Sequence, residues 1–195
     1  MARRQLTRYW HGGVPGLRPG DRLRPASQLA TLPSIHAWAG YDSDPDWVYV
    51  TVDRTHAKFH ASAYLDSSDR PGGDLYNVRP RGELQPDPDY PDGISFRCRS
   101  AIVVVAAERA IRPTRELQLS GLRYSTWLGG GPMYDSAGHM LPSPEMAAFG
   151  ITAEDLVDLG FGPDVTQAAT HCQRLLARRS QQPDAVAAGA GRPPP

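Results

Sequence analysis

The stretch "WVYVTVDRTHAKFHASAYL" at residues 47–65 decides the fold class, because it joins a strand directly to a helix. β-Branched and aromatic residues fill positions 47–52, a composition that predicts a buried strand. Asp53 follows as a typical helix N-cap, and the alanine-rich segment after it predicts a helix over about residues 54–65 whose inner face holds the alanines and Phe59. This strand and helix indicate a small α+β domain.

Further strands are expected on both sides of this stretch, within a first domain at residues 1–112. "TRYW" at residues 7–10 and "DLYNVRP" at residues 74–80 each predict a strand. "AIVVVAA" at residues 101–107 has the continuous apolar run of a strand that is buried on both faces. "QPDPDYPDG" at residues 85–93 carries three prolines, which exclude a helix or a central strand.

The composition changes after Pro113, where we expect a C-terminal extension over residues 113–180. "LQLSGLRYSTW" at residues 117–127 is compatible with one or two more strands, and residues 128–144 are rich in glycine and proline, which indicates a loop. Residues 181–195, "QQPDAVAAGAGRPPP", lack large apolar side chains and are predicted to be disordered.

Two short helices are predicted in the extension. Thr152 and Asp155 have the spacing of a capping box, and Gly160 is a typical helix stop. A second helix is expected from about Pro163, because apolar residues recur at spacings of three and four. These residues are Val165, Ala168, Ala169, Cys172, Leu175 and Leu176.

Composition excludes several classes of partner. The 195 residues include 21 basic and 21 acidic side chains, a balance that argues against binding to nucleic acid or to an acidic membrane surface. No apolar run approaches the roughly 20 residues of a membrane helix, and the N-terminus has no secretory signal. The distant cysteines, Cys98 and Cys172, fit unpaired thiols. We therefore expect a soluble cytoplasmic protein.

His11, Gly12 and Gly13 form the first candidate site, at the end of the predicted strand "TRYW". Glycines leave room for a flat ligand against the main chain, although a structural histidine beside a turn is the commoner case. Tyr49 is either a core ring or a ring that stacks on an aromatic ligand.

Charged residues offer two more candidates. Arg97 and Arg99 match the oxygens of a pyrophosphate, although surface arginines at a strand edge have the same pattern. Asp87 lies between two prolines that restrict its direction, with Asp89 and Glu83 as competitors.

Two further motifs are weak. His56 and His60 have the spacing of a metal pair on a helix, but no third ligand is evident and we expect no metal. Residues 129–131, "GGG", lack the lysine of a phosphate loop.

Four stretches in order along residues 8–112 carry a family pattern. They are "YWHGG" with "GLRPGDRLRP", "WVYVTVDRTHAKFHASAY", "GDLYNVRPRGELQPDPD" and "SFRCRSAIVVV". Together they resemble the rifamycin ADP-ribosyltransferase family, with its Tyr-x-His-Gly-Thr opening, its central strand tyrosine, its Tyr-x-Val-x-Pro strand and its Ser-aromatic-Arg segment.

The resemblance implies a small split β-sheet that holds NAD in a cleft, with His11, Tyr49 and Asp87 as the functional trio. His11 would bind a ribose hydroxyl of the adenosine half, and the main chain of Gly12 would hold the nicotinamide amide. Tyr49 would stack on the nicotinamide ring and Asp87 would face its ribose. The implied activity is transfer of ADP-ribose from NAD to a hydroxyl of rifamycin or another acceptor, which would confer antibiotic resistance.

Two departures keep alternatives open. Gly13 stands where the family has threonine, and the C-terminal extension has no counterpart in the family pattern. A catalytically degenerate nucleotide-binding or interaction module of the same fold is therefore the second hypothesis. RNA 2′-phosphate transfer to NAD is a third, which the neutral net charge disfavours. The acceptor can be a small molecule or a protein.

Overall fold

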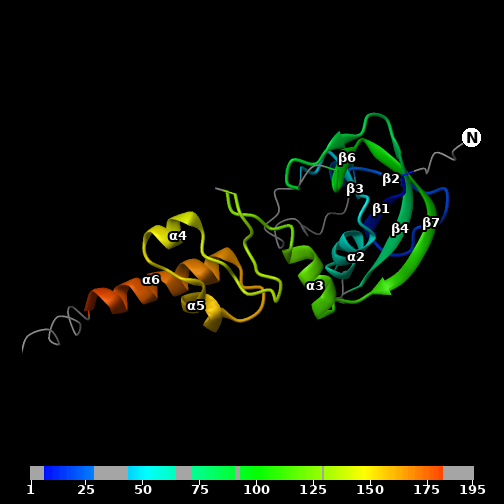
Figure 1. Cartoon of the computed structure of the whole chain (residues 1–195). Coiled ribbons are helices and arrows are strands. Elements are labelled where there is room, and N and C mark those ends of the chain that lie inside the picture. The colour runs from blue at the N-terminus through cyan, green and yellow to red at the C-terminus, as the bar shows by residue number, and fades with distance from the viewer. Residues whose placement is uncertain (1–6, 29–43, 65–71, 91–92, 129, 182–195) are drawn as a thin grey trace, which may run out of the picture. The chain divides into compact units, whose positions relative to one another are not determined.

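The computed structural model describes residues 7–28, 44–64, 72–90, 93–128 and 130–181 (Figure 1). The chain forms two compact units, Met1–Tyr124 and Ser125–Pro195. The first unit thus extends past the expected boundary at residue 112. Apart from Gln181, which ends a helix, the tail expected to be disordered lies outside the described residues.

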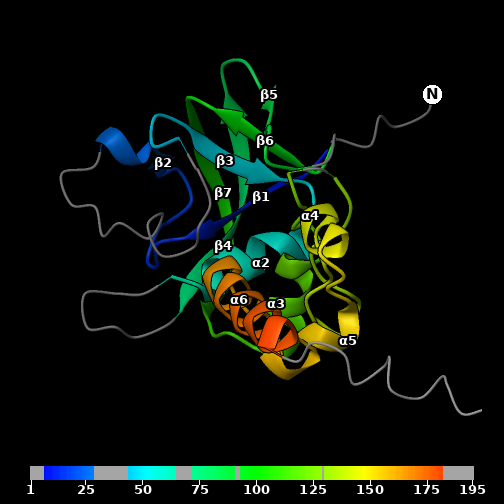
Figure 2. The same cartoon turned by 90° about the vertical axis from the view of Figure 1, so that its left-hand side faces the viewer.

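The described part of the first unit contains an antiparallel sheet of seven strands, with the order β2-β7-β4-β1-β3-β6-β5. The strands are β1 (Tyr9–Gly13), β2 (Arg22–Leu23), β3 (Val48–Thr51), β4 (Gly73–Arg81), β5 (Gln85–Pro86), β6 (Ser95–Cys98) and β7 (Ser100–Ile111). Figures 1 and 2 show these strands as one curved sheet. The strands predicted around residues 7–10, 47–52 and 74–80 are confirmed, and the proline-rich segment supplies only the edge strand β5.

Strand β7 is longer and less buried than the apolar run at residues 101–107 predicts. Val103 is buried in the core, but the side chains of Val104 and Val105 are 50% and 46% exposed. Helix α2 (Arg54–Ser62) packs near Ala107, farther along the strand. Because α2 does not cover Val104 and Val105, the prediction that this strand is buried on both faces is wrong for these two residues.

Helix α2 begins where the sequence predicts. The Asp53 side chain accepts hydrogen bonds from the backbone N–H groups of Thr55 and His56, which caps the first turn. Ala57 and Ala61 face the sheet and are buried with Leu75 of β4. The helix is therefore fixed both by its cap and by its small residues.

Helix α3 (Arg115–Leu122) replaces the strands that residues 117–127 were expected to form. Thr114 caps its first turn by accepting a hydrogen bond from the Leu117 N–H. Gly121 lies so close to the Phe59 ring of α2 that a Cβ at this position would overlap it. Phe59 thus packs toward α3, and this packing joins residues up to Tyr124 to the first unit.

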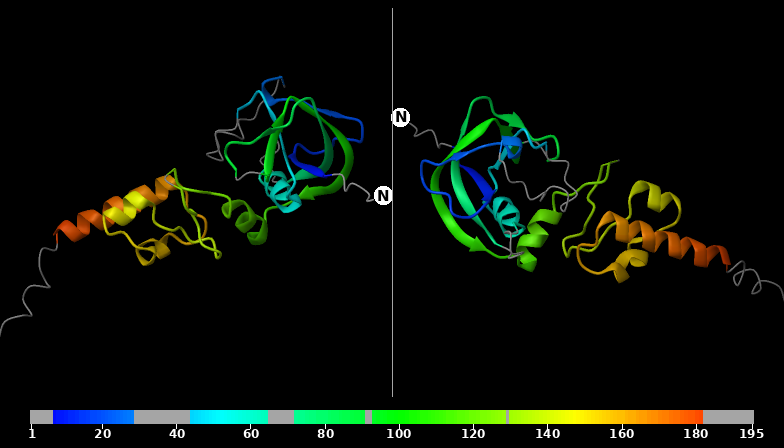
Figure 3. Two further views of the ribbon diagram at one scale, coloured as in Figure 1. Left: turned by 45° about the horizontal axis from the view of Figure 1, so that its top comes forward. Right: turned by 180° about the vertical axis from the view of Figure 1, so that it is seen from behind.

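The second unit contains three α-helices in its described residues, α4 (Pro144–Ala148), α5 (Ala153–Leu156) and α6 (Val165–Gln181) (Figure 3). Both parts of the Thr152–Asp155 capping box are present, and Gly160 follows a short 3₁₀ turn with a positive φ of 77°. The apolar stripe of α6 is buried only in part, at Ala168 and Cys172. Within the described part of the chain, no helix has the length and apolar character needed to cross a membrane.

Candidate functional site

The two faces of β3 have different environments. Val48 and Val50 point into the core with Cys98, whereas Tyr49 and Thr51 point to the opposite face. In the β3–β6 ladder Tyr49 pairs with Arg97, so the phenol ring and the guanidinium group start from neighbouring positions on one face.

Asp87 joins this face through Ser95. The Ser95 hydroxyl donates a hydrogen bond to Oδ2 of Asp87 over 2.8 Å, and the Asp89 N–H donates to Oδ1 over 3.2 Å. The Asp87 side chain is buried, with 3% of the residue exposed. Among the described residues, no lysine or arginine forms an ion pair with it.

Tyr49 and Asp87 lie close enough for their charges to interact. Burial raises the pKa of the Tyr49 hydroxyl, and the negative charges of Asp87, Asp44 and Asp89 raise it further, against a hydrogen bond to the Asp44 carbonyl. The phenol is therefore neutral near pH 7. A neutral ring beside a buried carboxylate suits stacking rather than proton transfer.

His11 lies where the sheet is nearly divided. Strands β1 and β3 share a single ladder pair, Trp10 with Thr51, whereas β1 and β4 share five pairs. The same register would place Gly12 opposite Tyr49, but the ladder has no pair there. Instead, Nδ1 of His11 lies 2.9 Å from the carbonyl oxygen of Tyr49. The imidazole thus bridges the two strands.

The protonation of His11 follows from this contact. Burial lowers the pKa of His11 more than the hydrogen bond to the Tyr49 carbonyl raises it, so the ring is neutral near pH 7. A carbonyl oxygen only accepts hydrogen bonds, so we assign the proton to Nδ1. Nε2 then carries a lone pair that is able to accept a hydrogen bond.

The two glycines after His11 were expected to leave room for a flat ligand, but in the structure they accommodate neighbouring parts of the protein. A Cβ at Gly12 would overlap the main chain of Ala57, so Gly12 is required for the close approach of α2. A Cβ at Gly13 would lie 2.8 Å from Nε2 of His11. The space beside Gly13 is therefore filled by the imidazole.

Arg97 and Arg99 both stack on Trp47. Their guanidinium carbons lie 4.7 Å and 3.8 Å from the Trp47 ring centroid. Arg99 also donates a hydrogen bond to the Asp46 carbonyl. Nε of Arg97 is buried and has no hydrogen-bond partner among the described residues. This guanidinium is held in place by packing on Trp47.

The structure brings the segments of His11, Tyr49, Asp87 and Arg97 together, although the residues approach differently. Tyr49, Asp87 and Arg97 share one face, whereas the His11 side chain starts from the other and reaches only the main chain of β3. Sequence reasoning missed Ser95. The alternation of Ser95 with Arg97 along β6 would have placed both on one face.

The weaker candidates are placed elsewhere. His56 and His60 lie on α2 with 3.2 Å between their Nε2 atoms, and the described residues contain no cluster of three or more side chains suited to a metal. Of residues 129–131, Gly129 lies outside the described residues. Glu83 is exposed in the turn between β4 and β5.

Comparison of the chain with models of known protein families and with curated proteins found no match.

Proposed function

We propose that this protein is an NAD-dependent mono-ADP-ribosyltransferase that transfers ADP-ribose to a hydroxyl of a rifamycin or another acceptor and releases nicotinamide. The observation that carries this proposal is Asp87, a buried carboxylate beside the Tyr49 ring with no cationic partner among the described residues. A buried negative charge without a fixed counter-charge is suited to stabilise positive charge on a ligand.

The reaction needs such a charge. The bond between the ribose carbon and the nicotinamide nitrogen breaks with both electrons going to nitrogen, which neutralises the cationic ring and leaves positive charge on the ribose. The acceptor oxygen then forms the new bond to carbon and its hydroxyl proton is released to water. Because the positive charge is greatest in the transition state, the Asp87 carboxylate binds that state more strongly than it binds NAD.

The neighbouring groups have complementary roles. Tyr49 offers a neutral ring for stacking on nicotinamide, which orients the departing group. Nε2 of His11 accepts a hydrogen bond from a ribose hydroxyl, and the main-chain edge of Gly12 binds the nicotinamide amide. Arg97 binds the pyrophosphate, since its guanidinium group starts from the same face as Tyr49, is held by Trp47 and forms no ion pair among the described residues.

The alternative is a nucleotide-binding module of the same kind without turnover. It is favoured by two observations, the engagement of both Asp87 carboxylate oxygens by internal donors and the filling of the space at Gly13 by His11. Such a module binds NAD but does not release nicotinamide. The two proposals therefore predict different products from the same incubation.

The test is incubation with NAD, with and without rifampicin, followed by mass spectrometry of nicotinamide and of the acceptor. We expect nicotinamide release and rifampicin carrying one ADP-ribose. Asp87→Asn should reduce the rate by about 100-fold or more, because an amide supplies no charge. Glu83→Gln, which changes an exposed carboxylate of the preceding turn, is the matched control and should retain the rate.

Each failure has its own meaning. NAD binding in calorimetry without nicotinamide release would support the non-catalytic module. If rifampicin stays unmodified, a cell lysate searched for ADP-ribosylated proteins tests a protein acceptor. The enzymatic proposal is overturned if neither acceptor is modified.

A further inference from the structure

A cluster of rings lies on the α2 side of the turn that carries Asp87. At its centre is His56, which is 1% exposed. Its ring centroid lies within about 6 Å of four other rings, at 4.6 Å from His60, 4.7 Å from Tyr90, 4.8 Å from Tyr124 and 6.2 Å from Phe59. We call these five residues the His56 ring cluster.

Tyr90 connects this cluster to Asp87. The Tyr90 N–H donates a hydrogen bond to the Asp87 carbonyl oxygen over 3.3 Å, which closes the turn at residues 87–90. The Tyr90 ring packs edge-on against His56 and lies 6.0 Å from the Tyr124 ring. The turn is thus held by Ser95 at the carboxylate and by His56 at Tyr90.

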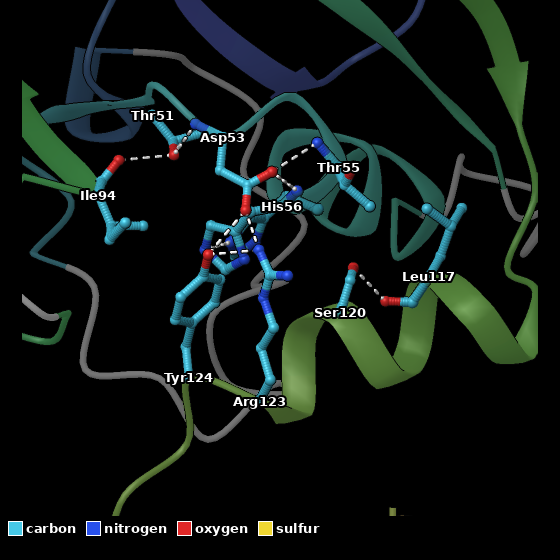
Figure 4. Close-up of polar contacts among 10 residues, drawn as sticks. Thr51, Asp53, Thr55, His56, Ile94, Leu117, Ser120, Arg123 and Tyr124 are labelled. Carbon is cyan, nitrogen blue, oxygen red and sulfur yellow. Dashed lines mark hydrogen bonds and ion pairs between the residues drawn. The ribbon is translucent and has the colours of Figure 1, made fainter. Parts of the chain in front are cut away.

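The other side of the cluster is anchored by Asp53, as Figure 4 shows. The Tyr124 hydroxyl donates a hydrogen bond to Oδ2 of Asp53 over 2.7 Å, and Arg123 forms an ion pair with the same carboxylate. Burial alone would raise the pKa of Asp53, but the hydrogen bonds from the Tyr124 hydroxyl and the His56 backbone N–H and the charge of Arg123 hold it below its usual value. Asp53 therefore ties the end of α3 to the start of α2.

The His56 side chain is polar, although the buried site that it occupies among other rings would also accept an apolar ring. Its Nδ1 is buried with no hydrogen-bond partner among the described residues, and its Nε2 contacts Nε2 of His60. Buried nitrogen without a partner costs stability and is uncommon away from functional sites. The position at the junction of α2, α3 and the Asp87 turn gives this histidine a role in holding the turn.

We infer that His56 is a positioning residue, which holds the Asp87 turn against α2 and α3 through the rings of Tyr90 and Tyr124. The catalytic consequence rests on the proposed function, but the structural consequence does not. Because His56 acts on the carboxylate that stabilises the transition state, its loss should lower kcat and leave the KM for NAD nearly unchanged.

The experiment compares His56→Ala with Val103→Ala in the full chain. Val103 is a core residue of β7 and does not belong to the cluster, so its variant controls for a general loss of stability. Hydrogen exchange of the amides of Asp87, Asp89 and Tyr90 should be faster by about tenfold or more in His56→Ala, and unchanged in Val103→Ala. His56→Phe should restore slow exchange, since the ring itself provides the packing.

Activity provides the second readout. We expect kcat for nicotinamide release to fall on the order of tenfold in His56→Ala, with KM for NAD within about twofold, and to recover in His56→Phe. If His56→Ala does not fold, Tyr90→Ala removes the ring from the turn side and should have the same two effects.

The inference is overturned if exchange at Asp87, Asp89 and residue 90 is the same in the His56 or Tyr90 variant and in the control. Equal loss of kcat in Val103→Ala would also overturn it, because the effect would then follow stability alone. A wild-type chain that releases no nicotinamide contradicts the proposed function, while the exchange measurement still decides the role of His56.

Discussion

Two buried carboxylates, Asp74 on the inner strand β4 and Asp87 after the edge strand β5, have opposite electrostatic settings. Asp74 on β4 is 2% exposed and accepts hydrogen bonds from the Gly16 and Ala110 N–H groups, the Tyr76 hydroxyl and Arg109. Asp87 is equally buried, but its donors are the Ser95 hydroxyl and one N–H group.

The difference separates a structural carboxylate from a candidate catalytic one. Burial alone would raise the pKa of Asp74, but the hydrogen bonds from Gly16, Arg109, Ala110 and Tyr76 hold it below its usual value. The negative charge of Asp74 is therefore already balanced within the fold by Arg109 and the hydrogen-bond donors around it. The charge of Asp87 has no such partner among the described residues, and a ligand that develops positive charge would supply one.

The Asp74 network has a structural use near the candidate site. The Tyr76 hydroxyl has one proton, which it shares between the Val14 carbonyl at 2.7 Å and Oδ2 of Asp74 at 3.0 Å. Its oxygen accepts a hydrogen bond from the Leu17 N–H, while Asp74 accepts from Gly16. Burial and the neighbouring Asp74 raise the pKa of Tyr76 to about 12, so its hydroxyl keeps its proton. These bonds hold the segment that follows His11 and the two glycines.

Substitution of the two carboxylates should give the largest contrast. Asp74→Asn should lower the free energy of unfolding by about 3 kcal/mol, because it leaves a set of buried donors and Arg109 without their charged acceptor. Asp87→Asn should cost only about 1 kcal/mol, since an amide oxygen still accepts from Ser95. Urea unfolding monitored by circular dichroism measures both, and equal losses would remove the distinction.

A pH titration should distinguish His56 from Asp74, with a smaller effect on stability. Burial lowers the pKa of His56 from 6.5 to about 4. As the pH drops from about 6.5 towards 4, the unfolded chain is protonated at His56 before the folded chain is, so the free energy of unfolding falls. The loss from His56 should reach about 2 kcal/mol at pH 5. The lowered pKa of Asp74 stabilises the fold above its ordinary value of 3.8, so this contribution is retained at pH 5.

His56→Phe is the control for this titration. It removes the His56 contribution and leaves the other histidines, including His11, in place. Unfolding in urea at about pH 7.5 and at about pH 5 should then show a pH dependence smaller by about 2 kcal/mol than in the wild type. An unchanged pH dependence would show that His56 does not titrate as a buried group.

Arg97 and Arg109 should differ in their effect on NAD binding. Arg97→Gln should raise the Kd for NAD by about tenfold, since it removes a charged donor to the pyrophosphate. Arg109→Gln should leave this Kd unchanged and lower the thermal midpoint, because Arg109 already binds Asp74. Calorimetry and thermal denaturation of both variants provide the test, and similar Kd values for the two would contradict a phosphate contact at Arg97.

Gly13→Thr should give the smallest effect. Gly13 pairs with Asp74 in the β1–β4 ladder, and its missing side chain leaves space for the His11 imidazole. A threonine would displace a side-chain ring rather than main chain, so we expect a stability change within about 1 kcal/mol. The KM for NAD should change by about threefold, and the His11 ring signals should shift in NMR spectra. Unshifted His11 signals would show that the ring does not occupy this space.

Local sequence signals determined much of this fold. Asp53 and the capping box at Thr152 place two helix starts, because the cap and the N–H groups it binds are within three residues of each other. The prolines at residues 85–93 restrict that segment to a sheet edge because they remove backbone donors. The segments of His11, Tyr49 and Asp87 were also identifiable as candidates, since each has an unusual local pattern.

Only the tertiary structure decided the rest. The helix at Arg115–Leu122 depends on the fit of Gly121 against Phe59, and the roles of Asp74 and Asp87 depend on Arg109 and Ser95, which sequence position alone does not pair with them. The purpose of Gly12 and the ring cluster around His56 likewise appear only when α2 lies on the sheet. Caps and turns are short-range interactions that a sequence displays directly. Burial, counter-charges and strand register arise between segments far apart in the chain, and they exist only once those segments pack together.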